Sequence, residues 1–209
     1  MNKKHKNGKI IYFLHRIINY VKKYIIGIYR AKIFELDIKN PGPRIVSDLN
    51  PSFRLAVKKD ILSMDKDNYD FNKKNKVYFI DRLERGDRCI LAIYKGKIIG
   101  YIWLIKDKME LRPKKYIDLG KNRSYSYKGF VLKEYRGRRI HGAMYGYIID
   151  ILKKDRKRFV VSTVDMDNYS SLKTKERGGY KTLGYLTHLR FFGLKYDHIS
   201  KKNLNYLKN

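Results

Sequence analysis

The spacing of hydrophobic and polar residues changes along the chain, and its first regular pattern is that of a helix. Between residues 10 and 28 an apolar residue recurs every three or four positions, as on one face of an amphipathic helix. The stripe consists of Ile10, Leu14, Ile17, Val21, Ile25 and Ile28, and the residues largely between them include Lys9, Arg16, Lys22, Lys23 and Arg30. This pattern predicts a basic amphipathic helix. The sequence KNPGPR at 39–44 then interrupts regular structure, so we expect a helical extension and linker over 1–45 and a separate domain over 46–209.

From residue 52 onwards, short β-rich runs alternate with segments of helical spacing. The runs that predict strands are 52–57, 88–105, 124–132, 158–165 and 180–194. Within 88–105 two such runs flank a turn at Lys95–Gly96, which predicts a hairpin. Helical spacing is found at 58–64, 69–85, 140–152 and 168–177, whereas 106–123 is mixed and is predicted to be rich in loops. The alternation predicts an α+β domain of three layers, with helices against a central sheet.

The charge of the chain narrows the class of its partners. Its 209 residues include 49 Lys and Arg against 20 Asp and Glu, a formal net charge of +29. Part of this excess follows from the Lys, Ile, Tyr and Asn usage that A/T-rich codons favour. The remainder predicts attraction to polyanions such as the phosphates of CoA, nucleic acid or anionic lipid.

The cysteine, the histidines and the hydropathy of the chain argue against three kinds of feature: an internal disulfide, a zinc site and a membrane-spanning segment. The single Cys89 cannot form an internal disulfide, and its place in the apolar run RCILAIY predicts a buried structural thiol. The five histidines are scattered and do not have the spacing of a zinc site. No apolar stretch approaches the ~20 residues that cross a bilayer, and the basic N-terminus lacks the pattern of a signal peptide. We therefore expect a cytoplasmic protein without a metal.

The sequence YRGRRIHGA at 135–143 joins a predicted strand to a predicted helix. Backbone N–H groups at the start of a helix have no partner within the helix, and the helix dipole there favours negative charge. Such a junction is a natural site for a diphosphate, and Arg136, Arg138 and Arg139 add charged donors. Because a loop that continues directly into a helical turn needs no positive φ, we expect the N–H groups of 138–142 to remain available.

This junction and the later segment DNYSSLKTKERGGYKTLGY at 167–185 together resemble the GCN5-related N-acetyltransferase (GNAT) family. In that family a strand ending in Val-x-Pro is followed by Arg/Gln-x-x-Gly-x-Gly/Ala. Farther on come an Asn, a small residue three positions later, a Tyr-Glu-Lys-like triplet and Gly-Phe. The matching positions here are Val131, Arg136, Asn168, Ser171, Lys175–Arg177 and Gly179–Tyr180, over a resemblance that spans roughly 52–194. Lys133 replaces the proline, and Arg139 and His141 replace the two glycines of the turn.

The resemblance implies a mixed, mostly antiparallel central sheet flanked by helices. It also implies transfer of acetyl from acetyl-CoA to a primary amine of a small molecule or an amino sugar. The main-chain groups of Phe130 and Val131 would pair with the pantetheine arm, and the N–H near Val131 would polarise the thioester carbonyl. The residues that it assigns to acetyl-CoA are Phe130, Val131, Arg136, Gly137, Arg138, Arg139, Ile140, His141, Gly142, Asn168 and Ser171. Asn168 has an alternative role as a helix N-cap.

The groups that transfer protons are less well defined. The family often has a tyrosine, the proton donor to the departing thiolate, where Lys175 stands. Lys175 is therefore one candidate donor, although a lysine is more commonly solvated at the surface. Tyr169 and Tyr145 are alternative donors. No motif fixes the base that deprotonates the amine, and the candidates are Glu110, Asp118, Asp165 and His188.

Several alternatives stay open. Residues 9–30 could contact an anionic membrane at its inner face, or their apolar stripe could pack on the domain or on a second copy in a homodimer. The charge and the 19 tyrosines also fit an RNA-directed acyltransferase or an RNA-binding protein. We favour this less, because the tyrosines lie largely within predicted strands and helices and no nucleic-acid-binding signature is present. Finally, the altered turn would also fit a catalytically degenerate GNAT domain that acts as a scaffold at the membrane surface.

Overall fold

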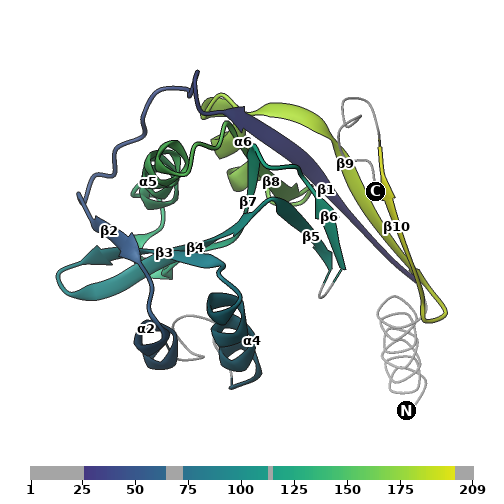
Figure 1. Cartoon of the computed structure of the whole chain (residues 1–209), viewed down its shortest axis with the longest axis horizontal. Helices are drawn as coiled ribbons and strands as arrows, with labels where there is room; N and C mark the ends of the chain where they lie inside the picture. Colours follow the sequence, from purple (N-terminus) through teal and green to yellow (C-terminus); the bar gives the residue numbers. More distant parts are fainter. Residues whose placement is uncertain (1–25, 65–72, 113–114, 201–209) are drawn as a thin grey trace, which may run out of the picture.

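The computed structural model describes residues 26–64, 73–112 and 115–200. The strands are β1 (Ile26–Asp37), β2 (Ser52–Leu55), β3 (Arg88–Tyr94), β4 (Lys97–Lys106), β5 (Lys108–Arg112), β6 (Lys115–Asp118), β7 (Arg123–Val131), β8 (Phe159–Asp165), β9 (Lys181–Phe191) and β10 (Leu194–Ile199). Eight of them form one sheet in the order β10-β9-β1-β8-β7-β4-β3-β2 (Figure 1). Each described pair in this sheet is antiparallel except β7 with β8, which is parallel. The predicted mixed, mostly antiparallel sheet is confirmed.

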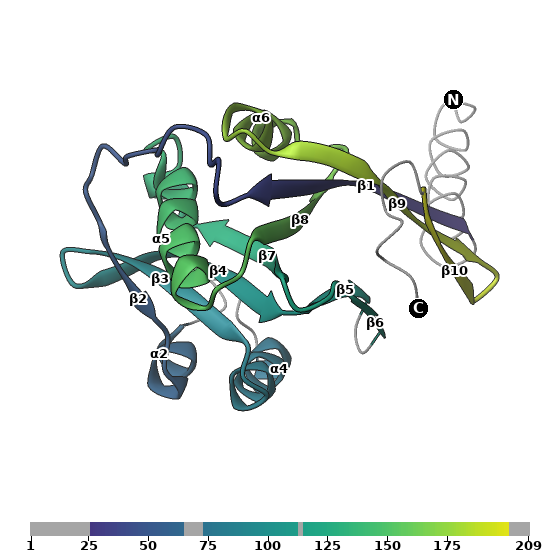
Figure 2. The same cartoon turned by 45° about the horizontal axis from the view of Figure 1, so that its top comes forward.

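Helices cover both faces of this sheet. They are α2 (Lys58–Ser63), α4 (Lys73–Glu84), α5 (Ile140–Lys154) and α6 (Tyr169–Arg177). The helices α5 and α6 lie on one face, and α2 and α4 lie on the other (Figures 1 and 2). The predicted apolar stripe of α5, from Ile140 to Leu152, is buried against β3, β4 and β8. On the opposite face Phe79 of α4 stacks on Trp103 of β4, with ring centroids 4.8 Å apart. The predicted three-layer α+β architecture is therefore the observed one.

The first described element corrects the predicted N-terminal helix. Residues 26–30 were expected to end that helix, but they begin β1, which lies between β8 and β9 in the sheet. The buried side chains of β1 alternate along the strand: Ala31 and Ile33 are buried on one face, and Phe34 and Leu36 are buried on the other. This alternation is the mark of a strand, and the helical stripe does not continue through it. The chain before residue 45 thus supplies a strand to the main sheet, although it was assigned to an extension.

One other prediction needs a smaller correction. Residues 106–123 were expected to be rich in loops, but they include the hairpin of β5 and β6. After the last predicted strand, β10 extends to Ile199. The remaining strands and helices are confirmed, as is the hairpin turn, where Lys95 and Gly96 have φ of 49° and 77°.

The predicted membrane-contacting segment at 9–30 lies mostly outside the described residues, since only 26–30 are described. In the part of the chain that the structure describes, none of the helices combines the length and apolarity needed to cross a bilayer. Cys89 is fully buried, as predicted. No cluster of three or more His, Cys, Asp or Glu suited to a metal ion is found among the described residues.

Candidate functional site

The two parallel strands at the centre of the sheet are paired over only part of their length. The ladder joins Arg123–Ser126 of β7 to Phe159–Ser162 of β8. Beyond it β7 carries a bulge: Phe130 pairs with Tyr101 and Tyr127 with Trp103, so three steps along β7 match two along β4. Lys128 in this bulge has a left-handed φ of 48°. A bulge bends its strand and ends the pairing beside it. The last residues of β7 therefore border an opening at the edge of the paired region.

The junction between β7 and α5 turns sharply before the helix begins. Gly137 has φ of 79°, and Arg139, the N-cap of α5, has φ of 58°. The expectation that this turn needs no positive φ is therefore wrong, since Arg139 adopts the conformation that a glycine would adopt at no steric cost. Two contacts hold the turn in place. The Arg139 guanidinium pairs with the Asp48 carboxylate at 2.6 Å, and the Ser47 hydroxyl donates to the carbonyl of Arg138 at 2.8 Å.

The N-terminus of α5 nevertheless presents its backbone donors. The first N–H of this helix with a described backbone partner is that of Ala143, which donates to the carbonyl of Arg139 at 3.0 Å. The N–H groups of Ile140, His141 and Gly142 precede it and belong to the first turn, where the helix offers no acceptor. The dipole of the 15-residue helix adds a partial positive charge at this end.

A cleft of about 990 Å³ joins this helix start to the end of β7. It reaches Gly129, Phe130 and Val131, so Arg139 and His141 do not close the junction. Of the residues predicted to bind acetyl-CoA, those that line the cleft are Phe130, Val131, Arg136, Gly137, Arg139, Ile140, His141, Gly142, Asn168 and Ser171. Arg138 is absent from the lining. The fold therefore brings together two segments that are about 30 positions apart in the sequence.

The cleft has the electrostatics of an anion site. Its described lining includes Arg44, Arg136, Arg139 and Arg177, and no Asp or Glu. Arg136 also donates from Nε to the carbonyl of Val131 at 3.0 Å. The same carbonyl was predicted to pair with the pantetheine arm. In this structure it accepts a hydrogen bond from the Arg136 side chain.

Segment 41–49 contributes a wall that the sequence did not indicate. The sequence KNPGPR was interpreted as a linker, but Pro43, Arg44, Ile45 and Val46 line the cleft. Ile45 packs closely on Gly142: a Cβ added at position 142 would lie 2.7 Å from Cγ2 of Ile45. Arg44 pairs with Asp150 of α5 at 2.9 Å. The local sequence carries turn signals only, so nothing in it could have revealed these long-range contacts.

Asn168 has the alternative role that was considered for it. Its side-chain oxygen accepts from the N–H of Ser171 at 3.1 Å, which makes it the N-cap of α6. The same residue lines the cleft. Capping and a contact with a bound molecule are compatible, because the amide nitrogen of an asparagine remains a donor when its oxygen is used.

His141 lies between the helix start and the bulge of β7. Its ring is so close to Gly129 that a Cβ at that position would be 2.3 Å from Nε2. It also meets Tyr145 edge to face, with ring centroids 5.2 Å apart. Burial and the nearby charge of Lys175 lower the pKa of His141 to about 4. The imidazole is therefore neutral at neutral pH and adds no charge to the site.

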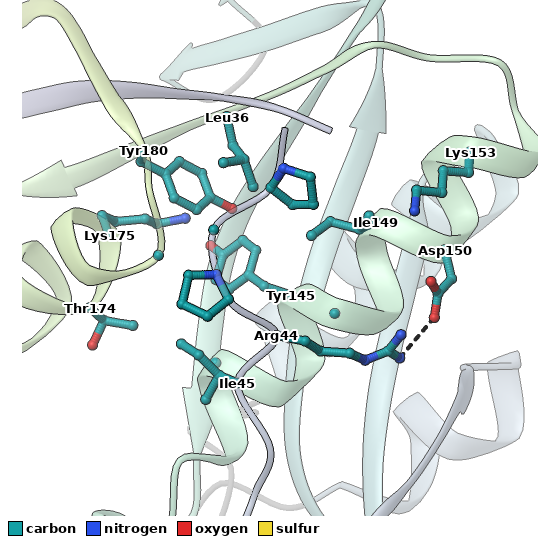
Figure 3. A pocket seen from close by; sticks show the side chains of 16 residues that line it. Leu36, Arg44, Ile45, Tyr145, Ile149, Asp150, Lys153, Thr174, Lys175 and Tyr180 are labelled. Atoms are coloured by element: carbon teal, nitrogen blue, oxygen red, sulfur yellow. Dashed lines mark hydrogen bonds and ion pairs between the residues drawn. The ribbon is translucent and has the colours of Figure 1, made fainter. Parts of the chain in front are cut away.

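Lys175 is buried, although lysines are more commonly solvated at the protein surface. Its side chain is only 2% exposed and points between two aromatic rings (Figure 3). The Nζ atom is 3.6 Å from the ring centroid of Tyr145 and 4.1 Å from that of Tyr180. Burial lowers its pKa well below the usual value for a lysine. Lys175 lines a smaller cavity of about 290 Å³ between α5, α6 and segment 41–45, and it is not among the residues that line the cleft.

The other candidates for proton transfer also lie elsewhere. Tyr169 is 70% exposed and does not line the cleft, and Tyr145 is buried with its hydroxyl 3.2 Å from that of Ser126. None of the predicted bases is among the described lining residues of the cleft; these are Glu110, Asp118, Asp165 and His188. Glu110 instead contacts Tyr78 and Arg82, and His188 contacts Asp197. The structure thus brings the residues predicted to bind acetyl-CoA together in one cleft, except Arg138, but not the predicted acid and base.

Comparison with solved structures shows where this architecture occurs. An acetyltransferase of the GNAT family from Colwellia psychrerythraea is similar over 79% of this chain and 57% of its own, with a TM-score of 0.60 and 10% identity. A GCN5-related N-acetyltransferase from Sphaerobacter thermophilus is similar over 83% of this chain and 55% of its own, with a TM-score of 0.55 and 14% identity. At this identity the likeness concerns the fold alone, and the chain spans a little over half the length of each.

A third solved structure has a more specific description. It is the GCN5-related glucosamine N-acetyltransferase region of a fungal multi-domain GH3 β-N-acetylglucosaminidase, with a TM-score of 0.59 and 16% identity. The similarity covers 84% of this chain and 22% of that protein. No protein with a curated description is significantly similar in sequence.

The sequence itself matches the family model described as the acetyltransferase (GNAT) family, over residues 46–180. This match covers more than half of the chain and includes β7, the turn before α5, and α6. These elements line the cleft together with segment 43–46. The chain belongs to the GNAT acetyltransferase family.

Proposed function

We propose that this protein is an N-acyltransferase that takes acetyl from acetyl-CoA and transfers it to a primary amine of a small molecule. The observation that supports this most directly is the cleft, which combines an unpaired helix start with four arginines and leads to the end of β7. A diphosphate needs N–H donors and positive charge, and an extended arm needs a groove beside a strand.

The residues that line the cleft fall into two groups, according to the part of CoA that each group suits. The N–H groups of Ile140, His141 and Gly142, with Arg136 and Arg139, suit the diphosphate of CoA. The strand end at 129–131 suits the pantetheine arm that follows it. When bound, acetyl-CoA supplies an activated acyl thioester. The proposal does not depend on Lys175 or Tyr169, since neither lines the cleft.

The chemistry asked of the protein is mainly to position two reactants. In the transfer the amine nitrogen forms a bond to the acyl carbon, the carbon–sulfur bond breaks, and the proton of the amine goes to solvent or to the thiolate. Aligning the reactants in one site can supply ~7–11 kcal/mol of the barrier reduction. A cleft lined on one side by a strand and on the other by α6 is suited to this role.

For the acceptor, we propose an amino sugar as the first class to test. An uncharged amine is the reactive form. Arg44 and Arg139 are paired with Asp150 and Asp48, but the cleft also has Arg136 and Arg177 and no described acidic lining residue, which disfavours a cationic ammonium there. One protein that shares this fold is described as a glucosamine N-acetyltransferase region, and for this reason we place the same class first in the test.

The first experiment measures CoA binding by thermal shift and calorimetry with millimolar CoA. Arg136→Ala removes a charged donor that lines the cleft, and we expect its affinity for CoA to fall about tenfold or more. Arg138→Ala is the matched control, because Arg138 is an exposed arginine of the same turn that does not line the cleft. Its affinity should stay within about twofold of the wild type.

Absence of any CoA-dependent shift, or an equal loss in both variants, would contradict the proposal. The second experiment incubates the protein with labelled acetyl-CoA and a panel of amines and amino sugars, with products identified by mass spectrometry. CoA binding without transfer to any amine would instead support the degenerate scaffold.

A further inference from the structure

The end of the sheet that is farthest from the cleft carries exposed apolar side chains on one face. In the register of β1, β9 and β10, Ile28, Leu189 and Tyr196 form one cross-strand row. Phe191 and Leu194 belong to the next row on the same face, since successive same-face rows are two residues apart. All five side chains are between 37% and 75% exposed, and Phe192 in the turn is 67% exposed. We refer to these six residues as the apolar tip.

The opposite face of the same three strand ends is polar. Its rows are Gly27, Arg190 and Lys195, followed by Tyr29, His188 and Asp197. The next row on that face contains Ala31 and Leu186, which are buried in the core. The apolar tip therefore faces away from this core. No described helix covers it, because the β9–β10 turn lies at the far end of the sheet from α5 and α6 (Figures 1 and 2).

The charges around the apolar tip indicate which kind of partner fits this surface. Residues 26–34 and 183–196 contain Arg30, Lys32, Arg190 and Lys195 but no Asp or Glu. Of these four residues, Lys32 is paired with Glu176 at 3.2 Å. Asp197, which follows Tyr196 in β10, has a side chain that is 3% exposed and is bonded to His188 and Lys115, each at 2.6 Å. A second copy of the chain would bring another cationic surface, as would the chain's own segment 9–25 with Arg16, Lys22 and Lys23. Only an anionic surface is complementary to this patch.

We propose that the apolar tip docks on a bilayer of anionic phospholipids. The side chains of Phe191, Phe192 and Leu194 enter the boundary between headgroups and acyl chains, and Lys195 and Arg30 contact lipid phosphate. An exposed apolar patch next to positive charge is the composition that such binding requires. The docking leaves the cleft at the opposite end of the sheet accessible to soluble substrates.

The test compares co-sedimentation of the full chain with vesicles of phosphatidylcholine and with vesicles that also contain about a third phosphatidylglycerol. We expect strong binding to the anionic vesicles, weak binding to the neutral ones, and a decrease with rising salt. Phe191→Ser, Phe192→Ser and Leu194→Ser together should reduce the partition coefficient by at least about tenfold, because each removes apolar area that the bilayer buries.

The matched control replaces three equally exposed apolar residues elsewhere. Val57, Leu62 and Val77 are 58%, 53% and 65% exposed on the side of the sheet that carries α2 and α4. Their combined change to serine should leave vesicle binding within about twofold of the wild type. Thermal melts followed by circular dichroism verify that both triple variants remain folded.

A direct probe is Phe192→Trp, whose fluorescence should shift to the blue when anionic vesicles are added. The unchanged Trp103 is fully buried and serves as a constant background. The proposal is overturned if the triple variant of the tip binds vesicles like the wild type, or if the fluorescence of the Phe192→Trp variant does not shift. It is also overturned if light scattering shows that the tip substitutions dissociate a dimer without changing vesicle binding.

Discussion

At the scale of single residues, the contact between His141 and Gly129 determines the shape of the cleft. The imidazole occupies the space where any larger residue at 129 would place its Cβ. The family pattern has a small residue where His141 stands, so this chain depends on a glycine on the facing strand. The pair could not be inferred from the sequence, because the two residues belong to different elements.

Gly129→Ala should therefore lower the free energy of unfolding by about 1–3 kcal/mol, the usual cost of forcing a methyl group into a filled space. His141→Ala opens that space. In urea unfolding, the double variant Gly129→Ala/His141→Ala should then be more stable than the sum of the two single changes predicts. Strict additivity would show that the imidazole does not occupy the position described.

The same histidine predicts a pH dependence. Its pKa is about 4 in the folded protein against an ordinary 6.5, so between these values the unfolded chain binds a proton that the native protein does not. Stability therefore falls as the pH decreases from 6.5 to 4. Urea titrations across this range should show a smaller decrease for His141→Gln than for the wild type. Carboxylates that titrate near pH 4 act in both proteins and cancel in the comparison. Parallel curves would contradict the lowered pKa.

At the scale of elements, the start of α5 contains a residue in an unfavourable conformation. Arg139 has φ of 58°, which costs a residue other than glycine ~1 kcal/mol or more. Arg139→Gly and Arg139→Ala both remove the ion pair with Asp48, so their difference reports the backbone alone. We expect the glycine variant to be more stable by about 1 kcal/mol in chemical denaturation. If α5 began in ordinary helical geometry, alanine would be the better residue and the order would reverse.

Strands and helices with their own strong pattern were predicted well. The hairpin of β3 and β4, the strand β8 and the helix α5 each follow from local periodicity and turn residues. Predictions failed where a pattern was short or changed along the element. The buried face of β1 changes between Ile33 and Phe34, so its sequence does not show one continuous alternation. The helical spacing read from the sequence also ran into this strand as far as Ile28. The hairpin of β5 and β6 has strands of only five and four residues, too short for a periodic signal.

At the scale of the whole molecule, β1 holds the two halves of the sheet together. It pairs with β8 on one side and β9 on the other, and Ala31, Ile33, Phe34 and Leu36 are at most 2% exposed. A chain that starts at residue 46, the predicted domain boundary, should fail to fold. The loss of four buried side chains, at about 1.5–3 kcal/mol for each of the larger ones, is comparable with the whole stability of a domain.

A chain that starts at residue 26 is the control and should unfold cooperatively. The measurement is thermal and urea unfolding followed by circular dichroism, together with the yield of soluble protein. Cooperative unfolding of the shorter chain would mean that the sheet is complete without β1, and would restore the predicted boundary.

The sequence alone determined the order of most elements, the positions of the strand end and the two loops that resemble the GNAT family, and the excess of positive charge. These are local properties, because periodicity, turn residues and motif spacing act within a few positions of the chain. The tertiary structure alone shows that β1 enters the sheet, that 43–46 line the cleft, that Lys175 is buried, and that no described helix covers the apolar tip. Each of these depends on contacts between residues far apart in sequence, and the free energy of burial is set by whichever elements meet there.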